Sequence, residues 1–275
     1  AAALRESRAA RIPWTFTPGN HDDDHAPWCR DDLLAIFKLP GCATPTATSF
    51  NFTFTIGTRA TAGEEVAAAS QPPGSDSGAA AATFCRVADG ETLVRLWVFD
   101  SGGNNDTGIR YDPFPKEVVA EFTRLTTWPQ DPAGAVSRGE PCPFDIQDPP
   151  GTPALAFFHI PLPEYTDAMP IVGSNNLFTA ALRSGGVPSP YKYVPWLVRC
   201  LGTDRIAGCS KVNTGMFEAL QRSQTHRVQA CFVGHDHYSD FVASCGRTYL
   251  CYGRVSSFTP PSNFEGDGGA LPFRV

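Results

Sequence analysis

Three apolar runs in the 275-residue chain lead directly into asparagine or histidine, and this pattern constrains the fold most. The runs are "IPWTFTP", "ALAFFHIPLP" and "RVQACFVGHDH". We interpret each as a buried strand, because short apolar runs bounded by Gly or Pro are typical of a sheet core. Helical patterns alternate with strands in the first and last thirds of the chain. The sequence therefore predicts an α/β protein whose sheet has helices on at least one face.

Other segments predict the remaining elements. Alternation in "SFNFTFTIG" indicates a half-buried strand, and "TLVRLWVFDSGG" and "RTYLCYGRVSSF" predict two more. "RDDLLAIFKLPGC" predicts a helix with Leu33, Leu34 and Phe37 inward, "DPFPKEVVAEFTRLTTW" predicts a helix with one apolar face, and "NTGMFEALQRS" predicts another. The first 11 residues resemble the end of a helix. Residues 60–82 predict a mobile surface insertion, and residues 170–213 have no clear pattern.

Composition narrows the possible partners and the location. The net charge is −6, and no basic stripe exists to neutralise a nucleic-acid backbone. No apolar stretch reaches the roughly 18 residues of a membrane span, so we expect neither nucleic acid nor membrane as partner. Nine cysteines and two glycosylation sequons, at Asn51 and Asn105, favour a secreted or vacuolar glycoprotein.

The cysteines suggest two disulfides. Cys245 and Cys251 lie in adjoining strand segments, and Cys200 and Cys209 bracket a short loop. For both pairs, free thiols are the alternative. Because nine is odd, at least one thiol is free or has its partner outside this chain.

Polar side chains gather where the three apolar runs end. In an open α/β sheet, ligands bind just beyond the carboxyl ends of the strands. If the runs are neighbouring strands, their ends meet at one point. The residues at these ends are Asn20, His21 and Asp22 after the first run, His159 in the second, and His235, Asp236 and His237 after the third.

Imidazole nitrogen and amide oxygen together favour a metal site for Zn, Fe or Mn. Simpler interpretations exist: a solvated acidic turn at "GNHDDDH", a core histidine at His159 and a polar hairpin at "GHDH". A structural zinc site built from Cys231, His235 and His237 is a further rival. Against it, Cys231 alternates within the apolar run and is expected to face the core.

The strings "GNHD", "FFHIPLPEY" and "GHDH" resemble the motifs of the calcineurin-like metallophosphoesterases. The longer "HIPLPEY", "VGHDHYSDF" and "LCYG" resemble the purple-acid-phosphatase-like branch found in plants and algae. The resemblance implies one domain over residues 1–275, folded as a four-layer α/β/β/α sandwich. It also implies two metal ions (Fe, Zn or Mn) and a bridging hydroxide that attacks the phosphorus of a small phosphate ester.

The family's roles carry over to matching positions. Asn20, His159 and His235 would bind one ion, and His237 would help to bind the other. His21 would act as the catalytic residue beside the phosphate, and Asp22 would orient its ring. The neighbouring residues 23–25 are expected to form a surface loop.

The chain departs from the family at its start. The D-x-H and G-D motifs that supply the first strand and the bridging carboxylate do not occur before Gly19. We therefore expect an N-terminally truncated piece of a metal-dependent phosphoesterase. The alternative is a non-catalytic family member that serves as a binding or structural module.

Three further residues have two open interpretations each. Asp100 is either near the site or a turn cap, and Glu164 and Tyr165 line the pocket or pack a loop. The sequence leaves the substrate-binding residues and the oligomeric state open.

Overall fold

The architecture is mixed α/β, with one seven-strand sheet and a few helices. The structure is a computed structural model, and it describes residues 13–22, 24, 29–44, 47, 49–57, 92–105, 107, 110–126, 151–168, 196–202, 207–223 and 226–254. In spatial order the strands are β1 (Phe52–Gly57), β2 (Thr92–Val98), β5 (Thr152–Phe157), β7 (His226–Val233), β9 (Thr248–Tyr252), β8 (Asp240–Cys245) and β6 (Trp196–Gly202).

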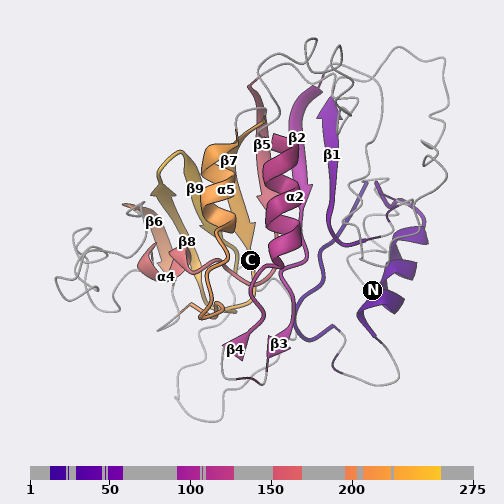
Figure 1. Ribbon diagram of the computed structural model, residues 1–275, viewed down its shortest axis with the longest axis horizontal. Coiled ribbons are helices and arrows are strands. Elements are labelled where there is room, and N and C mark those ends of the chain that lie inside the picture. The colour runs from indigo at the N-terminus through magenta and orange to yellow at the C-terminus, as the bar shows by residue number, and fades with distance from the viewer. Residues whose placement is uncertain are drawn as a thin grey trace.

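The four strands β2, β5, β7 and β9 run parallel, and the outer strands β1, β8 and β6 are antiparallel to their neighbours. The strands predicted in the second and third apolar runs are therefore confirmed, and the structure shows that they are adjacent and parallel. Their carboxyl ends meet at one edge of the sheet. A two-strand ribbon, β3 (Asn104–Asn105) and β4 (Arg110–Tyr111), lies at this edge (Figure 1).

Two predicted helices, α2 (Lys116–Thr126) and α5 (Met216–Arg222), cover one face of the sheet side by side (Figure 1). As predicted, α2 buries Val118, Phe122 and Leu125. Phe122 packs edge-on against Trp97 of β2, with ring centroids 4.9 Å apart. Burial of this aromatic surface fixes the helix against the parallel strands that end at the site. A short helix, α4 (Glu164–Ala168), follows β5.

The opposite face of β1 and β2 packs against the predicted helix η1 (Arg30–Lys38), which is a 3-10 helix. Phe37 is buried there against Phe50 and Phe52. The expected alternation in β1 is only partly confirmed, because Ile56 is 49% exposed.

The first apolar run is not a strand of the sheet, so that prediction was wrong. Among the described residues, one isolated bridge, Trp14 to Cys42, involves it. Pro13 and Pro18 lack backbone N–H donors, which leaves little room for a ladder. The segment is held to the sheet instead by Thr17 Oγ1, which donates to the Phe99 carbonyl at 2.7 Å.

Some predictions fall outside the described residues. These are the N-terminal helix end, the 60–82 insertion and the loop position of His25. The strand β6 lies in the stretch that the sequence left unassigned. No helix among the described residues is long and apolar enough to cross a membrane.

Neither expected disulfide is formed in the described part of the chain. On β8 and β9, Cys245 faces Thr248 and Cys251 faces Val242, so the two thiols are out of register. Both are free. Cys209 is also a free thiol and contacts Thr166 Oγ1 at 3.2 Å, rather than Cys200.

Candidate functional site: a donor triangle at the carboxyl edge

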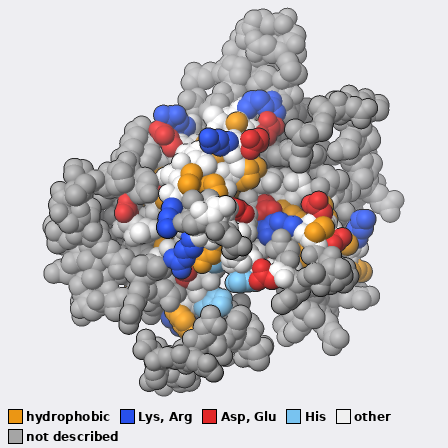
Figure 2. All heavy atoms as spheres, turned by 60° about the horizontal axis from the view of Figure 1, so that its bottom comes forward, with side chains coloured by type: hydrophobic (Ala, Val, Ile, Leu, Met, Phe, Trp, Pro, Cys, Tyr) orange, Lys and Arg blue, Asp and Glu red, His pale blue; other side chains and the backbone are white. Residues whose placement is uncertain are grey.

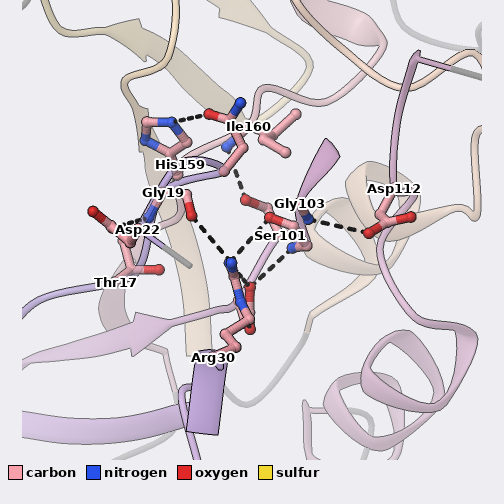
Figure 3. Close-up of polar contacts among 12 residues, drawn as sticks. Thr17, Gly19, Asp22, Arg30, Ser101, Gly103, Asp112, His159 and Ile160 are labelled. Carbon is pink, nitrogen blue, oxygen red and sulfur yellow. Dashed lines mark hydrogen bonds and ion pairs between the residues drawn. The ribbon is translucent and has the colours of Figure 1, made fainter. Parts of the chain in front are cut away.

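Three predicted ligands meet at the carboxyl edge of the parallel strands. Asn20 Oδ1 lies 3.0 Å from His159 Nε2 and 3.0 Å from His235 Nδ1. The two histidine nitrogens are 3.3 Å apart. We call these three atoms the donor triangle. Figure 3 shows the His159 ring, with one of its contacts drawn as a dashed line, close to Gly19.

The parallel strands explain how the histidines meet. His159 and His235 each stand two residues beyond the end of their strand, β5 or β7. The Gly234 N–H donates to the His159 carbonyl at 3.2 Å, so the two backbones continue side by side past the sheet. Asn20 arrives from outside the sheet and is only 3% exposed. A buried amide oxygen is thereby aimed at both rings.

The electrostatics keep both rings uncharged at neutral pH. Burial lowers the pKa of His159 to about 4, assisted by the positive charge that His235 would carry. Burial and the nearby Arg110 lower the pKa of His235 to about 4. Neutral imidazole is the form that binds a metal. Asn20 Oδ1 can only accept hydrogen bonds, so all three positions can offer lone pairs.

The spacing of the donor triangle fits the coordination of one ion. Donors about 2.1 Å from an ion are about 3.0 Å apart at right angles and about 3.4 Å apart at tetrahedral angles. The three observed separations, 3.0, 3.0 and 3.3 Å, fall in this range. Two nitrogens and one oxygen suit Zn, Fe or Mn. Among the described residues, no group of three or more His, Cys, Asp or Glu side chains could hold a metal, so this set depends on the asparagine.

Glycines allow the backbone to approach the rings closely. A Cβ on Gly208 would lie 2.5 Å from His235 Cδ2 and 2.6 Å from Asp236 Oδ1, and one on Gly19 would lie 3.1 Å from His159 Nε2. His235 itself has φ 84°, which is strained for a residue with a side chain. Such strain persists only where surrounding contacts enforce it. Here the Tyr111 ring packs edge-on against His235, with centroids 4.5 Å apart.

Asn104 orients the Asn20 side chain, a role that our sequence analysis missed. Its Oδ1 accepts from Asn20 Nδ2 at 2.7 Å, and its Nδ2 donates to the Asn20 carbonyl at 3.1 Å. The first bond fixes the amide so that Oδ1 points at the histidines. Asn104 lies beyond the carboxyl end of β2. Ligands bind just beyond the carboxyl ends of strands, and applying this expectation to β2 as well would have identified Asn104.

Arg30 connects the segment that carries Asn20 to the end of β2 (Figure 3). It makes a bidentate pair with Asp100, at 2.7 Å through Nε and 2.6 Å through Nη2. It also donates to the Gly19 carbonyl at 3.1 Å and the Gly102 carbonyl at 3.0 Å. Asp100 in turn accepts from the Gly102 N–H, so both expectations for it, near the site and turn cap, are met. No sequence signal pointed to Arg30.

The predicted pair of His21 and Asp22 is not formed. Asp22 accepts from the Gly19 N–H at 2.6 Å, and it is Asp24 that pairs with His21 Nδ1. The turn after Asn20 instead brings the Asp24 carboxylate against the His21 ring, so the contact that the resemblance implied for Asp22 is absent among the described residues. The His21 side chain is 72% exposed beside the site, which leaves it accessible to a ligand.

His237 does not join the donor triangle through any hydrogen bond among the described residues. It is half-buried, and its positive charge would lower the pKa of His235, although burial and the charges of Arg110 and His21 are larger causes.

The rival zinc site of Cys231, His235 and His237 is not formed among the described residues either. Cys231 is completely buried on the core side of β7, as its alternation predicted.

Asp236 stabilises the turn that carries His235 and was not assigned a role from sequence. Its Oδ2 accepts from the Gly208 N–H at 2.8 Å and from the Tyr252 hydroxyl. Burial raises the pKa of this carboxyl, and those two hydrogen bonds partly offset the increase.

Glu164 and Tyr165, for which the sequence left two roles open, are structural. Tyr165 is fully buried and donates to the Cys231 carbonyl, and Glu164 is buried with its Oε1 accepting from Asn213.

A polar cavity of about 350 Å³ opens beside Asn20. It is lined by Asn20, Asp24, Arg30, Asn51, Asp100, Gly102, Gly103, Asn104, Asp112 and Pro115. Figure 2 shows this edge of the molecule, where histidine side chains reach the surface next to acidic and basic ones.

The two sequons lie near this cavity. Asn51 Oδ1 accepts from the Asp100 N–H at 3.1 Å, and Asn105 Nδ2 donates to Asp112 at 2.6 Å.

Comparison of the chain with models of protein families, with curated proteins and with solved structures gave no match. The functional assignment therefore depends on the site itself.

Proposed function

We propose that the chain is part of a metal-dependent phosphoric ester hydrolase, in which Asn20, His159 and His235 hold one metal ion. The observation that carries this proposal is the donor triangle, with separations of 3.0, 3.0 and 3.3 Å. A bound ion would polarise the phosphoryl group and activate water for attack on phosphorus. The motif resemblance, which is independent of this geometry, supports the same chemistry.

The chain's own residues have distinct parts in this proposal. Asn104 holds the Asn20 amide, and the close packing of Gly208 and Tyr111 holds the His235 ring. His21, exposed beside the donor triangle and paired with Asp24, would protonate a leaving alcohol. His237 is the candidate ligand of a second ion.

The proposal extends to the four-layer α/β/β/α arrangement. Its support is the sheet face opposite α2 and α5, which carries aromatic side chains that are only partly covered. Phe157 and Phe232 stack there with centroids 4.9 Å apart, and Phe232 is 37% exposed. An apolar face of this kind suits a second sheet packed against the first.

A non-catalytic binding module remains the second candidate. One observation favours it: among the described residues, no carboxylate forms a hydrogen bond with the atoms of the donor triangle. Two ions without a bridging carboxylate would be bound weakly. The two functions differ in metal content and in turnover.

The test is metal content and hydrolysis of an aryl phosphate after loading with Mn²⁺ or Zn²⁺. We expect His235→Ala to lose the ion and to lower hydrolysis by about 100-fold or more. The matched control is His226→Ala, at the opposite end of the same strand. The absence of both bound metal and turnover in the unchanged chain would favour the binding module. Full metal binding by His235→Ala would contradict the proposed hydrolase, because His235 would then not be a metal ligand.

A further inference from the structure

The ribbon of β3 and β4 brings a cation to the donor triangle. Its strands pair Asn104 with Tyr111 and Asn105 with Arg110. Tyr111 packs on the His235 ring at 4.5 Å, and the Arg110 guanidinium carbon lies over the Tyr111 ring, 5.1 Å from its centroid. Arg110, Tyr111 and His235 therefore form a continuous stack that ends in solvent.

The backbone of Arg110 is strained to achieve this position. Its φ is 75°, and His235 is the other described non-glycine residue with a positive φ. Neighbouring contacts enforce the conformation, because Asp112 accepts from the Gly103 N–H and from Asn105 Nδ2. Arg110 and His235 are both strained, and the Tyr111 ring contacts both of them. Backbone strain of this kind clusters at functional sites.

The charge of Arg110 is not neutralised within the described part of the chain. The side chain is exposed and makes no ion pair there. The nearby carboxyl of Asp236 is occupied by the Gly208 N–H and the Tyr252 hydroxyl. By contrast, Arg30 on the other side of Asn20 is fully engaged by Asp100 and two carbonyls.

We infer that Arg110 binds the phosphoryl oxygens of the ester at this site. The inference rests on the proposed function and extends it by naming the group that recognises the anion. A planar guanidinium presents paired N–H donors that match two oxygens of a phosphoryl group. The contact with Tyr111 holds the guanidinium carbon 5.1 Å from the ring centroid and so places the cation beside His235. In an acidic chain of net charge −6, such a local cation offsets the repulsion of an anionic substrate.

The test is calorimetric titration of the Mn²⁺-loaded chain with inorganic phosphate. We expect Arg110→Gln to weaken phosphate binding about 10- to 100-fold, because it loses a charge-assisted bidentate contact. Arg110→Lys should retain part of the affinity, since it keeps the charge but not the fork. Neither substitution should weaken Mn²⁺ binding, because both leave Asn20, His159 and His235 in place. The matched control is Arg124→Ala, which removes an arginine on α2 paired with Glu121.

The outcomes separate this inference from the proposed function. Phosphate affinity in Arg110→Gln equal to that of the unchanged chain would overturn it, as would an unchanged chain that binds Mn²⁺ but no phosphate. If the unchanged chain binds no Mn²⁺, the proposed function fails, and titration of the metal-free chain then decides on Arg110. If the metal-free chain binds phosphate and Arg110→Gln abolishes that binding, an anion site at Arg110 is supported. If the metal-free chain binds no phosphate, the inference is overturned as well.

Discussion

The contact between Gly208 and the site offers a steric test of how tightly the donor triangle is held. In Gly208→Ala, the new Cβ would lie 2.5 Å from His235 Cδ2 and 2.6 Å from both His235 Nε2 and Asp236 Oδ1. Ordinary contact begins at 3.4 Å, so the ring must move by about 0.9 Å or the Gly208 segment must retreat. The ring cannot move freely, because Tyr111 packs against it.

The size of the effect follows from the geometry. A metal site tolerates displacements of only about 0.5 Å before its ligands lose their alignment. We therefore expect Gly208→Ala to weaken Mn²⁺ or Zn²⁺ binding about 10- to 100-fold. The strained packing should also lower the free energy of unfolding by about 1–3 kcal/mol.

The assay is calorimetric titration of the metal together with urea unfolding of the metal-free chain. Gly103→Ala is a matched control at the same edge of the sheet, because its Cβ would meet nothing closer than Asp112 Oδ2 at 3.9 Å. It should leave metal binding unchanged. If Gly208→Ala binds metal as tightly as Gly103→Ala does, His235 is not held in place for coordination, and the reasoning fails.

Two further substitutions test the supports of Asn20. Asn104→Ala removes the acceptor that fixes the Asn20 amide, so metal affinity should fall about 10-fold while urea unfolding changes little; unchanged affinity would mean that the amide needs no orientation. Arg30→Lys loses the bidentate pair with Asp100, so the unfolding free energy should fall by about 2 kcal/mol, measured by urea titration. Unfolding like that of the unchanged chain would show that the pair contributes nothing net.

The parts of the site that could be predicted from sequence are those that directly follow regular strands. His159 and His235 follow long apolar runs, and such runs become adjacent parallel strands whose ends coincide. Periodicity also predicted α2 correctly, because its buried residues recur at helical spacing. In these segments local pattern and tertiary packing favour the same structure, so the pattern alone suffices.

Prediction failed where side chains in loops choose among several partners. His21 has three aspartates within three residues, at positions 22, 23 and 24, and only the turn geometry selects Asp24. The bond from Arg30 to Asp100 spans 70 residues and leaves no local trace. The first apolar run was mistaken for a strand because its residues are apolar, although its prolines prevent a regular ladder.

The strain at the site gives a physical link between the fold and the proposed chemistry. Arg110 and His235 both have positive φ, and they are joined through the Tyr111 ring. Each such conformation costs on the order of 1–3 kcal/mol and is retained only if packing elsewhere offsets it. Here the packing is supplied by the ribbon β3–β4 on one side and Gly208 on the other. Glycine at either position would remove this cost. Their strain therefore supports a site in which a metal ligand and an anion-binding group must be held in fixed relation before substrate arrives.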